Sequence, residues 1–359
     1  MKETELTTIQ RRALGTVLLL APAMRLYPAR TAALAGPAAW LSPLLALPAL
    51  LGYGWLLHRL LARRLPEEDA AALLRRALGE RAGGAVLFLI GLFFLFYAAF
   101  TLRSGAQRFI TTIFPQAKPA PFVLSMGALA ALAAAGPVRA LGRCGKVILP
   151  VLLLSLGFVL LAALPTVQLD NLLPLRPRDA LPALRGAAPG LDVLTAVLFV
   201  SVFLSEPKAA RRFAPDAVWI ALLCLPLSLL GIALVGNFGA ELTASLQRPF
   251  FYLVRNLVFF QNVERVEALF VALWVFPDFL LVSCSLFALA RCIAPAIRLP
   301  ERRIAPIGGI VAAILACFLG RSAGSYTLLS ERVVPLVGMS FALLLLPGSL
   351  LIGRWRKRI

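Results

Sequence analysis

The sequence predicts an all-α polytopic membrane protein with about ten transmembrane helices. Hydrophobic residues make up 60% of the 359-residue chain, charged residues only 15%, and the mean hydropathy is +0.87. A soluble domain is about half apolar, so this composition points to a membrane protein. Apolar runs close to the ~20 residues that cross a bilayer recur along the whole length. A membrane β-barrel would need alternating segments of about ten residues, which the sequence lacks.

The apolar runs divide into ten predicted spans within one transmembrane domain, residues 1–359. Pro22, Arg25 and Pro28 interrupt the first span, because each disturbs a continuous membrane helix. Between the second and third spans, residues 63–81 predict a short amphipathic helix at the membrane surface. The predicted spans are residues 9–30, 38–61, 82–102, 119–136, 146–165, 188–207, 214–236, 266–291, 304–320 and 331–353.

The net charge is +19, and the distribution of the basic residues between the loops indicates the orientation of the chain in a membrane. The arginines lie in short loops between apolar runs and not on one domain face, so we predict membrane lipid as a partner and no nucleic acid. Ten spans place both termini on one side. The 59–81 loop and the tail after residue 353 carry most of the basic bias, which predicts cytoplasmic termini. Because residues 1–12 are polar, we expect no cleavable signal peptide.

The chain offers little for catalysis or metal binding. His58 is the only histidine, which excludes a histidine-based catalytic pair and a histidine-rich metal site. The five cysteines have no CxxC spacing and most lie in apolar runs, which argues against a disulfide framework. The sequence has no Walker A loop and no aspartate-rich Mg²⁺ motif. We therefore predict no catalytic residue, no metal, no cofactor and no enzyme activity.

Asp278 is the candidate functional acid inside a span. A charge near the bilayer centre costs about 2.5–3.5 kcal/mol on insertion scales, so such residues usually face a cavity or a partner. Asp278 follows Pro277 in the eighth span. The sequence leaves open a functional carboxylate, a protonated acid, or an ion pair with an arginine such as Arg103 near the end of the third span.

Residues 248–274 predict a surface segment that bends into a transmembrane helix on the outer side. In the first half, polar residues such as Arg248 are interleaved with apolar ones, which suits a helix lying on the membrane. The second half passes through Glu264, Arg265 and Glu267 into the eighth span. The carboxylates of Glu264 and Glu267 are favoured at the N-terminus of that helix because its dipole is positive there. The alternative is that these residues contact a ligand.

The first and sixth spans are the places where a transporter with inverted repeats would be broken. At residues 14–22, LGTVLLLAP, the glycine and proline either loosen the helix or mark a break that exposes backbone groups to a substrate. The matching segment of the sixth span, residues 194–206, is followed by Pro207 but contains neither Gly nor Pro. It gives little support for a polar site.

Several motifs taken together resemble one family. They are LGTVLLLAP (14–22), AWL (39–41), LGRCGKVILP (141–150), DNLLPL (170–175), RPF (248–250) and, most specific, NVERVEALFVALW (262–274). In their order and spacing, the chain resembles the spore-germination permeases, the GerAB-type B subunits of germinant receptors in the amino acid–polyamine–organocation (APC) superfamily. The motif residues are Asn171, Pro174, Pro249, Phe250, Glu264, Arg265, Glu267 and Trp274.

The resemblance implies a LeuT-like pair of inverted five-helix repeats, about residues 9–165 and 188–353. A ligand pocket would lie between the broken first and sixth helices, near the third and eighth. The partners implied are a germinant-receptor A subunit, a lipoprotein C subunit and a small nutrient such as an amino acid, in the cell membrane or the spore inner membrane. The candidate ligand-binding residues are Gly15, Thr16, Val17, Pro22, Tyr97, Val197, Phe199, Ser201 and Asp278.

The chain departs from the family pattern at this expected pocket. Family members commonly have a second glycine where this chain has Val17, and backbone N–H groups freed at a glycine pair would hold a carboxylate. Their sixth span often has a small residue and an acid where this chain has Val197 and Phe199. The scaffold is kept while the expected polar site is reduced, which fits an apolar or unusual ligand, or loss of ligand binding.

These observations lead to one hypothesis and two alternatives. The hypothesis is a membrane subunit of a spore germinant receptor that senses an amino acid or another small nutrient to trigger germination. The first alternative is an active amino-acid or polyamine transporter, for which Asp278 is the only good intramembrane acid to couple an ion. The second is a scaffold that docks partner subunits and binds no ligand.

Overall fold

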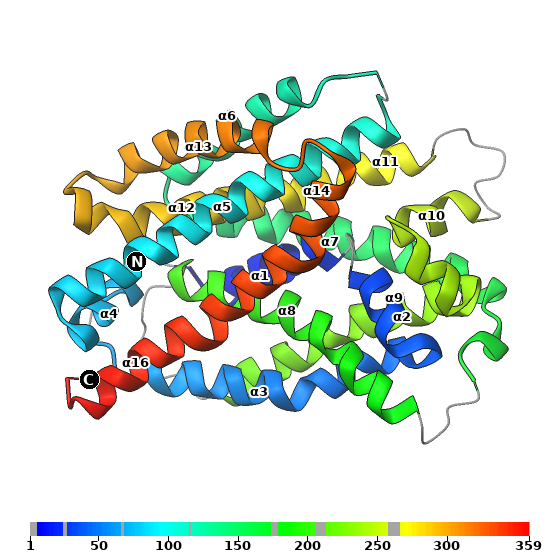
Figure 1. Cartoon of the computed structure of the whole chain (residues 1–359), viewed down its shortest axis with the longest axis horizontal. Coiled ribbons are helices and arrows are strands. Elements are labelled where there is room, and N and C mark those ends of the chain that lie inside the picture. Colours follow the sequence, from blue (N-terminus) through cyan, green and yellow to red (C-terminus); the bar gives the residue numbers. More distant parts are fainter. Residues whose placement is uncertain are drawn as a thin grey trace.

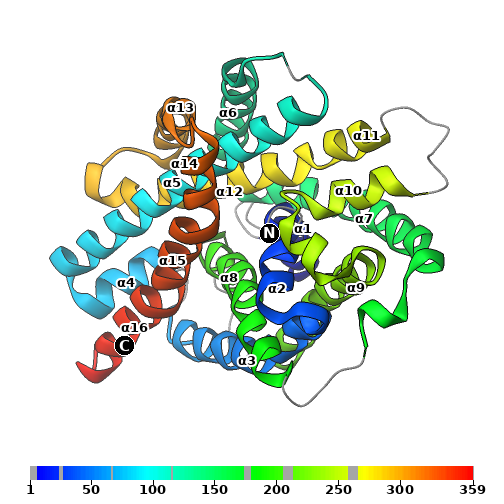
Figure 2. The same ribbon diagram turned by 45° about the vertical axis from the view of Figure 1, so that its right-hand side comes forward.

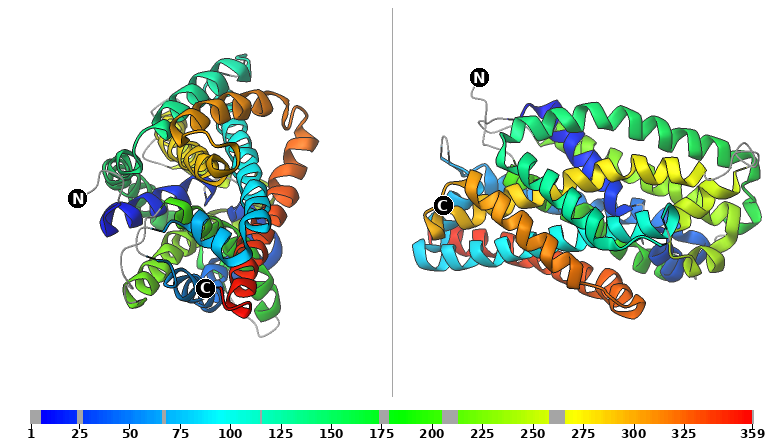
Figure 3. Two further views of the ribbon diagram at one scale, coloured as in Figure 1. Left: turned by 90° about the vertical axis from the view of Figure 1, so that its left-hand side faces the viewer. Right: turned by 90° about the horizontal axis from the view of Figure 1, so that it is seen from above.

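The computed structural model of the chain describes residues 6–23, 27–65, 68–114, 116–173, 179–204, 213–257 and 266–358. These residues form a bundle of helices, and no β-strand occurs among them. The beginning of the first helix and the end of the last lie at the same end of the bundle (Figure 1; Figure 3, right). The predicted all-α architecture is confirmed.

The first half of the chain begins with a span in two pieces. Helix α1 (Thr8–Ala23) ends one residue after Pro22, and α2 (Tyr27–Ala35) continues the span. The other elements of this half are η1 (Gly36–Leu41), α3 (Ser42–Leu61), α4 (Ala70–Leu78), α5 (Glu80–Thr112), α6 (Pro119–Ala135), α7 (Val138–Ala163), η2 (Leu164–Thr166) and η3 (Leu169–Asn171).

The second half ends in a span that alternates between α- and π-helical turns. Its elements are α8 (Ala180–Leu204), α9 (Ala214–Ser245), α10 (Pro249–Asn256), α11 (Val266–Leu273), α12 (Val275–Ile297), α13 (Glu301–Phe318), α14 (Ala323–Leu328), η6 (Leu329–Val333), α15 (Val334–Met339), η7 (Ser340–Leu345) and α16 (Leu346–Trp355). The π-helical turns are η6 and η7.

Seven helical stretches of the described chain are long and apolar enough to cross a membrane. Together with α1, α6 and α13 they account for the predicted spans. The protein is therefore an integral, multi-pass membrane protein. The seven stretches are Tyr27–Leu61, Glu80–Thr112, Val138–Thr166, Ala180–Leu204, Ala214–Ser245, Ala268–Ile297 and Gly324–Trp355.

The centre of the bundle is formed by α1, α2 and α8, and other helices surround them (Figure 2). Helix α12 packs against α5, α13 against α6, and α3 against α8. The interior is apolar and aromatic. Phe94 of α5 stacks on Phe199 of α8 with ring centroids 5.3 Å apart, and Phe203 meets both rings edge-on.

The surface helix predicted within residues 63–81 is α4, at the end of the bundle that holds the termini (Figure 1). The Asp69 carboxylate accepts a hydrogen bond from the Ala72 N–H at 2.7 Å, which caps the first turn. Two N–H groups of Arg76 bind the Glu68 carboxylate, each at 2.9 Å. Helix α4 packs on α5 and α16, so it ties the third span to the last.

The DNLLPL motif supports a kink in α9. Gly239 has a φ of +73°, a conformation that strains other residues, and it interrupts the helix. The Asn171 side chain donates to the Gly236 carbonyl at 3.0 Å, and the Gln168 backbone N–H donates to the same carbonyl at 2.9 Å. Asn171 thus satisfies a carbonyl near the kink, and Pro174 of the same motif lies outside the described residues.

Candidate functional site

A residue of the most specific motif binds the last described turn of α1, next to the predicted break before α2. Helix α1 is described to Ala23, and residues 24–26, which include Arg25, lie outside the described residues. The indole N–H of Trp274 donates to the Leu20 carbonyl at 3.3 Å. Trp274 is fully buried, and its ring lies 5.0 Å from that of Phe250. The motif therefore contacts the last described turn of α1 through a buried hydrogen bond.

A small cavity lies beside this break, and we call it the central cavity. Its volume of about 50 Å³ has room for a few water molecules, at about 10–15 Å³ each. Its walls come from the end of α1, from α2, α5 and α8, and from the last span. They consist of Pro22, Tyr27, Arg30, Phe93, Tyr97, Phe100, Asp192, Val193, Ala196, Ser330, Val334, Pro335 and Gly338.

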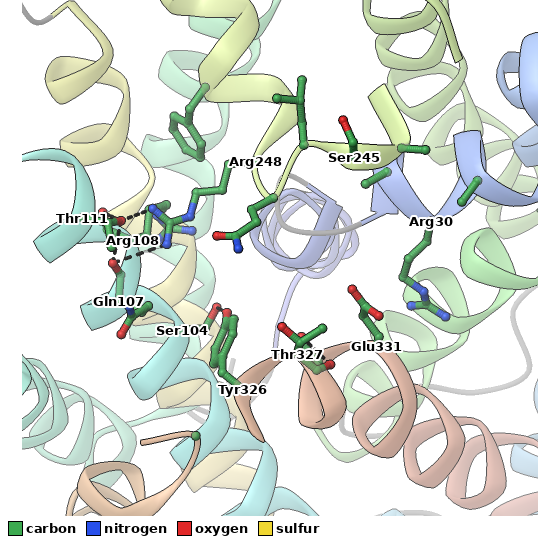
Figure 4. Close-up of a pocket in the computed structure, with 18 of the residues that line it drawn as sticks. Arg30, Ser104, Gln107, Arg108, Thr111, Ser245, Arg248, Tyr326, Thr327 and Glu331 are labelled. Atoms are coloured by element: carbon green, nitrogen blue, oxygen red, sulfur yellow. Dashed lines mark hydrogen bonds between the residues drawn. The ribbon is translucent and has the colours of Figure 1, made fainter. Parts of the chain in front are cut away.

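A second, larger cavity lies toward the end of the bundle opposite the termini, and we call it the vestibule. Its volume is about 490 Å³, within the range of about 300–1,000 Å³ typical of small-ligand sites. It lies between α2, α5, α10 and α14, and its walls are mostly polar side chains (Figure 4). Arg30 and Ser330 line both cavities, so the vestibule adjoins the central cavity.

An ion pair stands at the boundary between the two cavities. Arg30 of α2 donates to the Asp192 carboxylate of α8 at 3.1 Å. The side chains remain 22% and 12% exposed, so water reaches both partners. Arg30 lines both cavities and Asp192 lines the central one. Separation of the pair would widen the passage from the vestibule to the helix break.

A second ion pair, deeper in the protein, joins α5 to α12. Arg108 donates to the Asp278 carboxylate, and the two side chains are only 4% and 1% exposed. The same Arg108 nitrogen lies 3.4 Å from the Trp274 carbonyl. The arginine suggested from the sequence, Arg103, is not the partner, since it donates to the Gly320 carbonyl at 3.0 Å. Of the three alternatives that the sequence left open for Asp278, the structure shows the ion pair with an arginine.

Arg248 forms the vestibule wall next to Arg108 (Figure 4). It donates to the Thr111 hydroxyl and, at 3.4 Å, to the Gln107 carbonyl. Burial lowers the pKa of Arg248 below its ordinary value, and the positive charge of Arg108 adds to this effect. Ser104 and Tyr326 also line the vestibule, below Arg108 in Figure 4, and their hydroxyl oxygens lie 2.9 Å apart.

The candidate residues of the first-span motif occupy two different places. Pro22 lines the central cavity, together with Tyr97 of α5. Gly15 lies farther along α1, where a Cβ atom would come within 2.6 Å of the Trp219 ring. The Thr16 hydroxyl accepts the Trp219 indole N–H at 3.3 Å. Glycine is thus needed at position 15 for helix packing, and Val17 is fully buried in the same core.

The candidates on α8 lie in the protein core. Val197 and Phe199 are buried, and the Ser201 hydroxyl donates to the Val197 carbonyl at 2.8 Å. Helix α8 runs unbroken from Ala180 to Leu204 although Pro189 lies inside it, and its last part, residues 194–204, contains neither Gly nor Pro. Asp278 does not line either cavity, but its partner Arg108 lines the vestibule. A ligand-binding role for all these residues stays a prediction.

Sequence reasoning missed the charged residues that line the cavities. Asp192 lies inside the predicted sixth span, and Arg30 is the last residue of the predicted first span. A charge within or at the end of an apolar run was the available signal. Arg108 lies beyond the predicted end of the third span at residue 102, and Glu331 is the first residue of the tenth span, so both gave a weaker signal.

Two of the remaining motif residues, Pro249 and Phe250, lie behind the wall of the vestibule. Pro249 and Phe250 are buried at the start of α10, where Phe250 packs on Trp274. Glu264 and Arg265 lie outside the described residues. Glu267 belongs to α11, and its side chain is not among those described. A structural role for the acids at the bend therefore stays a prediction.

Comparisons with known proteins agree with this architecture. The sequence model of a family described as "Spore germination protein" matches residues 5–323. Among curated proteins, none matches the sequence. A crystal structure of MhsT in complex with L-phenylalanine is similar over 99% of both chains, with a TM-score of 0.65 and 14% identity. A substrate-bound, outward-open Na⁺-coupled sialic acid symporter is similar over 96% of this chain and 78% of its own, with a TM-score of 0.62 and 12% identity. These likenesses show a LeuT-like fold.

Proposed function

The chain belongs to the spore germination protein family, and we propose that it is the permease-like membrane subunit of a germinant receptor. In this role it would sense a small nutrient and pass the signal to partner subunits. We propose an amino acid as the ligand class. The similar fold of MhsT, solved with L-phenylalanine, supports this class by analogy only.

The observation that carries the proposal is the pair of adjoining cavities at the broken first span. The vestibule is large enough for a nutrient, whereas the central cavity of about 50 Å³ is not. A nutrient would therefore enter the vestibule first. It would reach the helix break only after Arg30 and Asp192 separate and the walls move apart. Such a requirement couples ligand binding to a change of shape, as a sensor needs.

The remaining parts of the proposal concern assembly and orientation. We propose that the termini face the cytoplasm, because basic residues gather at that end in the 59–81 loop and the C-terminal tail. The vestibule would then open to the outer side. A receptor A subunit and a lipoprotein C subunit would be the partners, as the family membership suggests. We also propose two inverted repeats, about residues 9–165 and 188–353.

Ligand binding to the purified full chain in lipid nanodiscs tests the proposal. L-amino acids and other nutrients are screened for a rise in the unfolding temperature. Ala196→Leu fills the central cavity and should abolish the response. Ala128→Leu makes the same change on the exposed surface of α6 and should leave the response intact. A screen in which no nutrient raises the unfolding temperature would contradict the sensing role.

Uptake into proteoliposomes separates a sensor from a transporter. A sensor should bind the labelled nutrient without concentrating it inside the vesicles. Concentrative uptake driven by an ion gradient would instead favour the transporter alternative. Binding of partner subunits with no response to any nutrient would favour the scaffold.

A further inference from the structure

The vestibule carries an excess of positive charge. Four arginines and one glutamate line it, namely Arg30, Arg108, Arg248, Arg321 and Glu331. Asp192 neutralises Arg30, and Asp278 neutralises Arg108. Within the described part of the chain, no ion pair is formed by Arg248, Arg321 or Glu331. The walls are therefore left with one more positive than negative charge that a ligand can meet.

Unused hydrogen-bond donors accompany this charge. Arg108 is only 3% exposed, yet its Nε and Nη1 groups have no hydrogen-bond partner among the described residues. A buried guanidinium with unsatisfied donors is costly unless something accepts them. Arg108 borders the vestibule, so an acceptor in that cavity comes next to its guanidinium, and a small shift of the wall would let it reach the enclosed Nε and Nη1 groups.

Arg248 lies beside Arg108 on the same side of the vestibule (Figure 4). Like charges held close together repel each other, and this repulsion contributes to the lowered pKa of Arg248. An anion between the two guanidinium groups would remove the repulsion and accept N–H groups from both. The Ser104 and Tyr326 hydroxyls border the same space, while Glu331 lies across the cavity (Figure 4).

We propose that the vestibule is a binding site for a small anion, a carboxylate or a phosphate, held between Arg108 and Arg248. This site is distinct from the central cavity, and it rests on the proposed function in that the vestibule is taken as the entrance for the ligand. Glu331 opposes binding by charge repulsion and so limits the affinity. Arginine is suited to this role because its planar fork matches both carboxylate and phosphate oxygens.

Calorimetric titration of the full chain in nanodiscs of neutral lipid tests the site. The probes are L-glutamate and inorganic phosphate, with L-alanine as a ligand of zero net charge. Arg248→Gln should weaken anion binding at least about tenfold, as expected for loss of a charged hydrogen-bond donor. Arg248→Lys should retain part of the affinity. Glu331→Gln should tighten anion binding severalfold, which a folding defect would not produce.

Arg302→Gln is the matched control, since Arg302 is exposed at the beginning of α13 and away from the vestibule. Binding of glutamate alone assigns a carboxylate site, and binding of phosphate alone assigns a phosphate site. No binding of either anion, or equal effects of Arg248→Gln and Arg302→Gln, would overturn the inference.

If the anions bind as expected but no nutrient acts through the central cavity, the sensing role fails while the anion site stands. If nutrients act through the central cavity and Arg248→Gln changes nothing, the anion site fails while the sensing role stands.

Discussion

The two ion pairs near the cavities differ in burial, and this difference separates a fixed wall from a movable boundary. Arg108 and Asp278 are 4% and 1% exposed, and they join α5 to α12. Arg30 and Asp192 are 22% and 12% exposed, and they stand between the vestibule and the central cavity. Breaking a buried pair leaves a charge without solvent, whereas partners in contact with water can separate at low cost. The difference in burial supports our proposal that the Arg108–Asp278 pair holds a fixed wall while the Arg30–Asp192 pair can open.

The largest effect should come from removing one partner of the buried pair. Asp278→Ala leaves Arg108 charged and buried, so it should lower the free energy of unfolding by about 3–5 kcal/mol. Denaturant or thermal unfolding of the purified chain in detergent measures this loss. Asp170→Ala removes an exposed acid and serves as the matched control, with little expected change. A loss no larger than that of the control would show that the pair does not fix the wall.

A smaller effect should follow when both partners are replaced together. Arg108→Met with Asp278→Leu removes both charges and fills the space with apolar groups, which is often neutral or stabilising for a buried pair. We expect the double variant to recover most of the stability that Asp278→Ala loses. The same unfolding measurement checks it. Arg108→Met and Asp278→Leu are also measured singly, and if their losses simply add up to that of the double variant, the two residues do not act as a pair.

The smallest effect on stability should come from the pair at the boundary. Asp192→Asn keeps the shape and a hydrogen-bond acceptor but removes the charge that faces Arg30. Because the pair is partly exposed, the free energy of unfolding should fall by only about 1 kcal/mol or less. A loss as large as that of Asp278→Ala would place this pair in the fixed framework and remove the distinction between the two.

The helices could be predicted from the sequence, but their polar ends could not. Apolar runs identify membrane segments because burial in lipid requires them, and the ten predicted spans correspond to helices in the structure. The third span was predicted to end at residue 102, where Arg103 begins a polar stretch. Helix α5 continues to Thr112, because its polar last turns face the vestibule and not lipid. The partner of Asp278 lies in that extension and was missed for this reason.

The candidate site was predictable only in part. The first span was expected to be interrupted at Pro22, Arg25 and Pro28, since proline disturbs helix hydrogen bonds, and α1 is described to Ala23 while Arg25 lies outside the described residues. The contact between Gly15 and Trp219 joins residues far apart in the sequence, and a single sequence does not contain such proximity. The same holds for the pairing of Arg30 with Asp192. A glycine motif that suggested ligand binding therefore also serves helix packing, and the polar site is built by charges from separate helices.

Access to the central cavity is the most direct test of the movable boundary. A cysteine introduced by Ala196→Cys lines that cavity, and its reaction with a charged, water-soluble thiol reagent reports whether the passage is open. The chain without this substitution corrects for the five native cysteines. We predict slow modification in the Ala196→Cys chain and clearly faster modification when Asp192→Asn is added. Equal rates with and without Asp192→Asn would contradict the account, because the ion pair would then not control the passage from the vestibule to the helix break.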